Sequence, residues 1–295
     1  MPGTAASIDQ LTGHNMAPDT VPDPKGQPPA SSGKRLLSLL INSPAYPALL
    51  VIAAICIWQF VVAKGLVPGV PTRYIGSPTG TWDAFVHLAN KGYLGSSLWQ
   101  EVSASLIRVL LGFAIGAGIA IPFGMAMGMY PSVGKLFGPI FSFLRPIPAL
   151  AFIPVVIIWF GIGQTGRIFV IATTAFLYAV LGVLGGVQHV PQAYLRAARN
   201  YHLSRRRTLL YVVLPAALPE IMVGLRTGMA LAWAVVVAAE LIAAQHGLGY
   251  MIENASTFFE VNVVYVGIAI IGAIGVLIEL GFALASKRLL HWVGR

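Results

Sequence analysis

Residues 103–129 read SASLIRVLLGFAIGAGIAIPFGMAMGM and carry one charged side chain, Arg108. Because an α-helix rises 1.5 Å per residue, roughly 20 apolar residues cross the hydrocarbon core of a bilayer. The stretch is therefore predicted to be a membrane-spanning helix. Two pairs of glycines within it lie four residues apart: Gly112 with Gly116, and Gly124 with Gly128. This spacing lets helices approach closely in lipid, although membrane helices are also glycine-rich in general, and either interpretation implies a bundle of packed helices.

Five other stretches of the chain are apolar over a comparable length. They cover about residues 45–63, 136–160, 168–187, 219–244 and 261–285. Of the 295 residues, 57% are hydrophobic and only 10% are charged, whereas a soluble domain carries about 25% charged residues. The sequence predicts an all-α fold, a polytopic membrane bundle of six transmembrane helices.

The N-terminal residues have a different composition from the rest. Residues 1–35 are rich in Pro, Gly, Ser and Asp and show no apolar periodicity, so they cannot bury enough surface to offset chain entropy. They also lack the basic start and apolar core of a signal peptide. We expect residues 1–35 to be a disordered cytoplasmic tail and residues 36–295 to be the membrane domain, with its core at about residues 98–288.

Lysine and arginine are unevenly distributed between the two sets of connecting segments. With the N-terminus inside, the inner segments hold eleven of these residues and the outer segments hold four. Cytoplasmic loops are enriched in Lys and Arg, so both termini and the loop at residues 188–218 are predicted to be cytoplasmic. The formal charge of +9 is explained by these loops, and we expect no nucleic-acid partner.

Enzyme chemistry has little support in this sequence. No Walker A phosphate loop is present, and GIGQTG at residues 161–166 matches a dinucleotide-binding pattern without the required βαβ surroundings. The single cysteine, Cys56, excludes an intrachain disulfide. No histidine spacing fits a metal site, and no serine stands in a nucleophile elbow. We therefore expect no catalytic residues, and no metal or cofactor bound by this chain.

Ionisable side chains inside the predicted spans need partners or water, since each costs at least about 2.5 kcal/mol at the bilayer centre. We counted five of them: Arg108, Arg145, Arg226, Glu240 and Glu279. Arg226 and Glu279 lie toward the cytoplasmic ends of their spans, and Arg108 and Glu240 toward the outer third. Matching depth predicts two structural ion pairs, Arg226–Glu279 and Arg108–Glu240.

Arg145 has no such partner and lies near the middle of its span. The following residues, PIPALAFIP at 146–154, contain three prolines that remove backbone donors and kink or break a helix. Broken helices at this depth occur only where they are packed in protein or line a cavity. Arg145 is predicted to border a polar pathway, and the alternative is that it packs against backbone carbonyls.

Residues 194–215, YLRAARNYHLSRRRTLLYVVLP, are too polar to cross a bilayer. They resemble the cytoplasmic loop of bacterial ABC importer permeases, whose pattern is E-A-A-x3-G-x9-I-x-L-P. The matching residues here are Ala197, Ala198, Leu214 and Pro215, with Val212 at the aliphatic position. The family's acidic residue is replaced by Arg196 and its glycine by His202.

Four further stretches are similar to the nitrate, sulfonate, taurine and bicarbonate branch of this family, over about residue 76 to the C-terminus. They are SASLIRVLLGFAIGAGIAIPFGMAMG, LRPIPALAFIPVVIIWFGIG, LPAALPEIMVGLRTGMALAWAVVVAAEL and GLGYMI. The resemblance implies a type I ABC importer permease in the bacterial inner membrane, working as a homodimer. It further implies two separate ATPase subunits that hold ATP and Mg²⁺, and a substrate-binding protein outside.

In such a permease the loop is a coupling helix that sits in a groove of the ATPase. The residues expected to couple are Arg196, Ala197, Ala198, Arg199, His202, Leu214 and Pro215. A translocation pathway is expected between the two copies near the third and fifth spans, lined by Arg145, Trp233 and Glu240. Arg196 reverses a charge at the ATPase interface, so we expect a compensating acidic residue on the partner.

Two other classes of function compete with this interpretation. An ATP-independent channel or secondary transporter would make the Ala-Ala loop incidental, and a membrane enzyme would need a catalytic set that the sequence does not show. The substrate is open, although three span arginines against two glutamates slightly favour a small anion.

Overall fold

The computed structural model describes residues 46–66, 71 and 74–292. The predicted tail at residues 1–35 and the first residue of the first predicted span, Ala45, lie outside these ranges. Within them the regular elements are all helical, apart from one isolated β-bridge between Tyr93 and Ser96. The predicted all-α class is confirmed.

Seven helices of the described ranges are rich in apolar residues. They are α2 (Tyr46–Ala63), α4 (Leu98–Met129), α5 (Pro131–Leu144), α6 (Ile153–Phe160), α7 (Gln164–Gln188), α10 (Leu214–Ala243) and α12 (Val261–Leu289). The remaining segments are α3 (Pro78–Lys91), the 3-10 turn η3 (Ala149–Phe152), α8 (Gln192–Asn200), α9 (Arg205–Thr208), the π-helical turn η4 (Leu209–Val213) and α11 (Leu248–Thr257).

Four helical segments of the described chain are long and apolar enough to cross a membrane: α4, α7, the run Arg205–Ile242 and α12. A fifth span would consist of α5 together with η3 and α6, which are bent by 89° where they meet. This bend lies at the predicted break after Arg145. The first predicted span corresponds to α2, whose apolar part Leu49–Ala63 is shorter than these, so the count of six stays a prediction.

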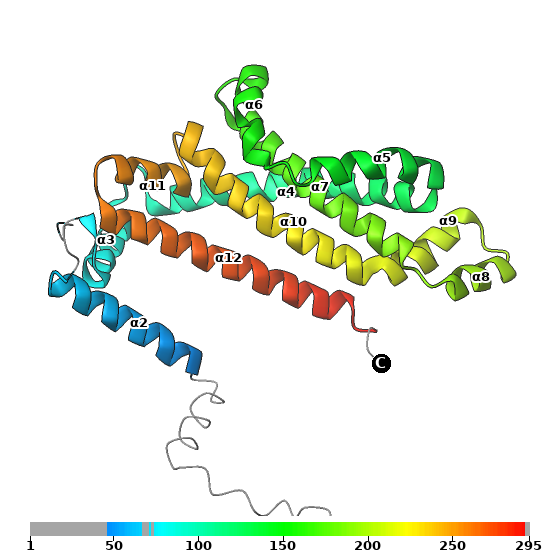
Figure 1. Ribbon diagram of the computed structural model, residues 1–295, viewed down its shortest axis with the longest axis horizontal. Coiled ribbons are helices and arrows are strands. Elements are labelled where there is room, and N and C mark those ends of the chain that lie inside the picture. Colours follow the sequence, from blue (N-terminus) through cyan, green and yellow to red (C-terminus); the bar gives the residue numbers. More distant parts are fainter. Residues whose placement is uncertain (1–45, 67–70, 72–73, 293–295) are drawn as a thin grey trace, which may run out of the picture. The chain divides into compact units, whose positions relative to one another are not determined.

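Residues from Ile57 onward form one compact unit, separate from Met1–Cys56. In this unit α4 packs along α7, and α7 packs along α10. Figure 1 shows α8 and α9 at one end of these three helices, and α3 and α11 at the other. The sites described below lie on this three-helix frame.

The paired glycines of α4 all face α7. A Cβ added at any of them would overlap a residue of α7, most closely Ile171, Ala172, Val183 or Val187. Their spacing therefore serves a close helix approach, which was one of the two interpretations of the sequence.

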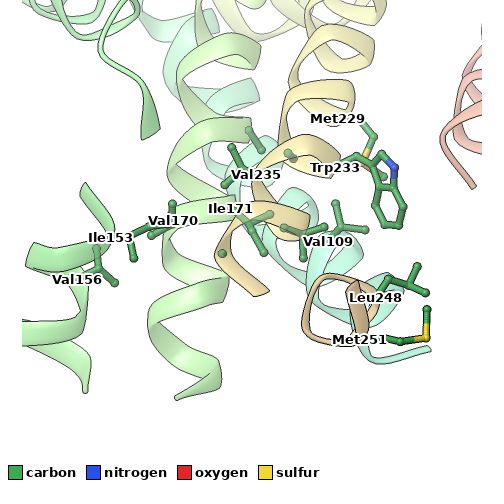
Figure 2. Packing of buried hydrophobic residues seen from close by; sticks show 14 of the residues in the cluster. Val109, Ile153, Val156, Val170, Ile171, Met229, Trp233, Val235, Leu248 and Met251 are labelled. Atoms are coloured by element: carbon green, nitrogen blue, oxygen red, sulfur yellow. The ribbon is translucent and has the colours of Figure 1, made fainter. Parts of the chain in front are cut away.

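The largest hydrophobic cluster fills the space where α4, α6, α7, α10 and α11 meet (Figure 2). Val109 and Ile171 are fully buried at its centre. Trp233 of α10 and Leu248 of α11 belong to the same cluster. The cluster fixes α11 and the end of α10 against α4, which positions the buried polar residues beside it.

The α7–α10 crossing is equally close, and it yields a stability prediction. A Cβ added at Gly224 would lie 2.7 Å from the Cα of Gly182, so Gly224→Ala must push the two backbones apart. We expect a loss of about 1–3 kcal/mol in the free energy of unfolding, as for overpacked cores. Unfolding in mixed micelles with rising SDS measures it. Gly118→Ala is the matched control, because nothing lies within 4 Å of its added Cβ. Equal stability of the two variants would contradict the crossing.

Candidate functional site

The predicted coupling loop, residues 188–218, contains α8, α9 and η4 ahead of α10. Pro191 is the residue before α8, with φ −57° and ψ 132°, and its side chain forms no cap hydrogen bond. One face of α8 is buried through Ala198, which is 3% exposed, whereas Arg196 and Arg199 are exposed. The helix therefore presents arginines to the surroundings and rests on the bundle through a small residue.

The chain leaves α8 through a left-handed turn at His202, which has φ +50°. The amide of Leu203 donates to the carbonyl of Ala198 at 3.1 Å, and that of His202 donates to Arg199 at 2.9 Å. These two bonds form a Schellman motif, whose left-handed position is usually glycine. The motif explains why the family pattern has glycine there, and this chain keeps the turn with histidine.

Replacing His202 by glycine should stabilise this turn. A non-glycine residue pays about 1–2 kcal/mol in the left-handed region, so His202→Gly should slow opening of α8 several-fold. Hydrogen exchange of the α8 peptide amides measures the effect. His202→Val should speed the same exchange, since β-branched residues fit this region worst. Faster exchange in His202→Gly than in the parent would contradict the assigned turn.

Both halves of the family pattern line one groove of about 660 Å³. Its walls include Tyr194, Ala197, Tyr201, Tyr211, Pro215 and Trp292. Leu214 and Pro215 begin α10, half-buried. Ala197 and Pro215, which are eighteen positions apart in the chain, thus meet on a single surface beside α8. Tyr194, Tyr201 and Tyr211 are large exposed side chains that the sequence analysis did not single out.

A second groove, of about 390 Å³, lies between the end of α5, α7 and α10. Arg145, the residue after α5, lines it, and its guanidinium carbon lies 5.6 Å from the centre of the Tyr178 ring. Arg145 is exposed and forms no ion pair with any described residue. The Tyr178 hydroxyl donates to the Arg145 carbonyl at 3.4 Å. The predicted alternative, packing against backbone carbonyls, has no hydrogen bond from the guanidinium among the described contacts.

The same groove contains a carboxylate, Glu220 of α10, that our count of span charges omitted. Nδ1 of His189 lies 2.8 Å from one of its oxygens. The signal was present in the sequence, since Glu220 directly follows Pro219 within the predicted fifth span.

Arg108 and Glu240 form an ion pair in the interior, and the side chains are 4% and 0% exposed. Arg108 also donates through Nε to Gln164 at 2.6 Å and through Nη1 to the carbonyl of His246 at 2.7 Å. Ser105 donates to Glu240 at 2.7 Å. Every charged group here therefore has several partners, as buried ions require.

The network continues into the turn that precedes α11. The amide of Gly249 donates to Glu240 at 3.0 Å, and that of Leu248 donates to Ser105 at 2.9 Å. Glu101, 1% exposed, accepts from the amide of Gly247. These bonds fasten the turn at residues 244–249 to α4 and α10. Neither Glu101 nor Ser105 was identified from the sequence.

Two residues predicted for the translocation pathway are buried in this structure. Glu240 is 1% exposed within the network above, and Trp233 is 7% exposed and donates to the carbonyl of Ile271 at 3.2 Å. In this conformation neither side chain faces a surface that a solute could contact, so a pathway role for them stays a prediction. The Arg226–Glu279 pair joins α10 to α12, and both side chains are about half exposed at 51% and 44%.

No group of three or more His, Cys, Asp or Glu among the described residues is arranged to hold a metal ion. Long apolar helices, a buried ion pair between two of them and a basic amphipathic helix at one end are together typical of a polytopic membrane protein. This is the architecture of a transport permease.

Comparison with known proteins agrees. The family of binding-protein-dependent transport system inner membrane components matches residues 118–291. The taurine transport system permease protein of Escherichia coli is 43% identical over 204 residues, which cover 69% of this chain and 74% of that protein. The bicarbonate transport system permease protein of Synechococcus elongatus is 33% identical over 232 residues, which cover 78% and 83%.

A solved inward-facing structure of the MetNI methionine ABC transporter has the same fold, with a TM-score of 0.53 at 17% identity, covering 72% of this chain and 99% of that chain. The chain belongs to the binding-protein-dependent transport system inner membrane component family. It is a membrane-spanning permease subunit of an ABC importer, and the family predicted from the sequence is confirmed.

Proposed function

We propose that two copies of this chain form the translocation pathway of an ATP-driven importer and that α8 couples them to two separate ATPase subunits. ATP and Mg²⁺ are bound by those subunits, and this chain hydrolyses nothing. A substrate-binding protein delivers the solute from the opposite side. Binding of ATP draws the ATPases together, and the two copies of α8 transmit that movement to the spans.

The groove beside α8 is the observation that carries the coupling role. Ala197 and Pro215, from the two halves of the family pattern, line it together. If the loop were basic only because cytoplasmic loops are enriched in Lys and Arg, the two halves of the family pattern would have no reason to line one groove. Arg196 and Arg199 project from the same helix and are available for acidic groups on a partner.

The basic end of the bundle is proposed to face the cytoplasm. Arg196, Arg199 and the three arginines of α9 are all exposed at the end where α8 and α9 lie. Positive residues are retained on the cytoplasmic side of membrane proteins. The ATPases then dock at this end, and the binding protein approaches the end formed by α3 and α11.

The solute is proposed to be a small molecule with an anionic group. The two relatives are named for taurine, which carries a sulfonate, and for bicarbonate. The guanidinium of Arg145 in the groove on α7 and α10 is exposed and has no ion-pair partner among the described residues, so it supplies matching charge.

Gentle detergent extraction from the native membrane, followed by intact-complex mass spectrometry, tests the assembly. We expect two copies of this chain with two ATPase copies. Reconstitution of that complex in liposomes, with the co-encoded binding protein, should give solute uptake that needs ATP. Recovery of the chain alone, with flux that persists without ATP, would instead identify a channel or secondary transporter.

A further inference from the structure

The groove between the end of α5, α7 and α10 is lined by glycines as well as by polar and charged side chains. Gly182, Gly185 and Gly224 line it where the two helices cross. The groove has a volume of about 390 Å³, whereas the space that side chains at Gly182 and Gly224 would fill is taken by the backbone of the facing helix. Small-molecule pockets begin at about 300 Å³, so the space suits a compact solute.

One end of the groove offers a cation that forms no ion pair with the residues that the structure describes. Arg145 is exposed, and its guanidinium lies over the Tyr178 ring at 5.6 Å. The contact with the face of the ring uses none of the five N–H donors of the guanidinium. Such a fork is matched to the paired oxygens of a carboxylate or sulfonate.

Another part of the groove offers a carboxylate with spare acceptor capacity. Glu220 is held by His189, with Nδ1 at 2.8 and 2.9 Å from its two oxygens, and its side chain is still 46% exposed. A carboxylate has about four lone-pair sites, and one imidazole N–H occupies only part of them. Thr227, whose hydroxyl already donates to the carbonyl of Val223 at 3.0 Å, adds a further oxygen acceptor to the groove.

We propose that this groove binds a small zwitterion, whose anionic group pairs with Arg145 and whose ammonium group pairs with Glu220. The inference rests on the proposed importer function and narrows its solute. A groove built for a simple anion has no use for a carboxylate, because like charge repels the ligand at short range. Arg145 and Glu220 together therefore select solutes with both charges against solutes that carry the anionic group alone.

The test compares two probes of nearly equal size in direct binding to the purified permease in lipid nanodiscs, with whatever subunits copurify. Taurine carries a sulfonate and an ammonium group, and isethionate replaces the ammonium group by a hydroxyl. We expect taurine to bind at least about tenfold more tightly, since a lost partly buried charge pair costs at least 1.4 kcal/mol. Equal affinities, or no saturable taurine binding, would overturn the proposal.

Variants separate the two ends of the groove. Glu220→Gln should weaken taurine binding about tenfold and leave isethionate binding unchanged or tighter, whereas Arg145→Gln should weaken both. Glu253→Gln is the matched control, because Glu253 is an exposed carboxylate on α11 outside the groove. If Glu220→Gln weakened both probes equally, the carboxylate would be structural and the proposal wrong.

Two further readouts identify the anionic group and separate this proposal from the importer function. β-Alanine, a carboxylate zwitterion of similar length, should also bind, and its affinity relative to taurine shows which oxyanion Arg145 prefers. Failure of β-alanine and taurine alike would contradict the zwitterion site. Uptake that needs ATP, with no discrimination between taurine and isethionate by the nanodisc sample, would refute the zwitterion site alone and leave the coupling role intact.

Discussion

Arg108→Met should destabilise the folded permease by about 3–5 kcal/mol, because it leaves Glu240 charged in the interior without its cation. Glu240 is 1% exposed, so water cannot replace the lost guanidinium without opening the packing around it. The same substitution removes the hydrogen bonds to Gln164 and to the carbonyl of His246. Unfolding in mixed micelles with rising SDS should show a strongly lowered midpoint.

Arg226→Met is the matched control for that result. It removes the same side chain from the Arg226–Glu279 pair, whose members are about half exposed. Both side chains are predicted to lie toward the cytoplasmic ends of their spans, where water can reach Glu279 after the substitution, so the control should lose less stability than Arg108→Met. The double variant Arg108→Met with Glu240→Gln should lose less than the sum of the single changes. Similar losses in Arg108→Met and Arg226→Met would contradict the burial assigned to the Arg108 network.

The partners of Arg108 illustrate how much the sequence could reveal. The pairing of Arg108 with Glu240 was predicted from their similar depth in the membrane. Hydropathy places each residue along the membrane normal, and few oppositely charged side chains lie at any one depth. The other members of the network were out of reach. Glu101 and Ser105 act through the turn at residues 244–249, which folds back onto α4. No local sequence pattern predicts that this turn packs against residues of α4 more than 130 positions earlier in the chain.

At the Arg145 groove the sequence predicted the local backbone but not the residues that come together there. The prolines after Arg145 predicted a broken helix, and the structure bends there by 89°. The break could not be turned into a site from the sequence, since the carboxylate of the groove lies on α10, 75 positions further along the chain. Glu220 was visible as a charge in an apolar stretch, but its proximity to Arg145 follows from the close crossing at Gly182 and Gly224.

Arg196→Glu should weaken association with the ATPase by at least about tenfold and lower uptake that needs ATP to a similar extent. Arg196 is exposed on α8 at the position where the family pattern has an acidic residue. If the partner has adapted with an acidic group, reversing the charge places like charges together, which costs several kcal/mol at an interface. Retention of the ATPase after detergent extraction, titrated against salt, measures the loss.

The control for this prediction is a charge reversal in another segment that is predicted to be cytoplasmic. Lys135→Glu changes an exposed cation near the start of α5, outside the loop that carries the family pattern. If the loop is basic only to orient the protein in the membrane, Arg196→Glu and Lys135→Glu should weaken ATPase association equally, because each removes general attraction to acidic surfaces. Coupling through α8 predicts that Arg196→Glu alone releases the ATPase, and that raising salt weakens the parent complex toward the variant. Equal effects of the two substitutions would assign the arginines of this loop to membrane orientation, and the position of Arg196 within the family pattern would then carry no partner information.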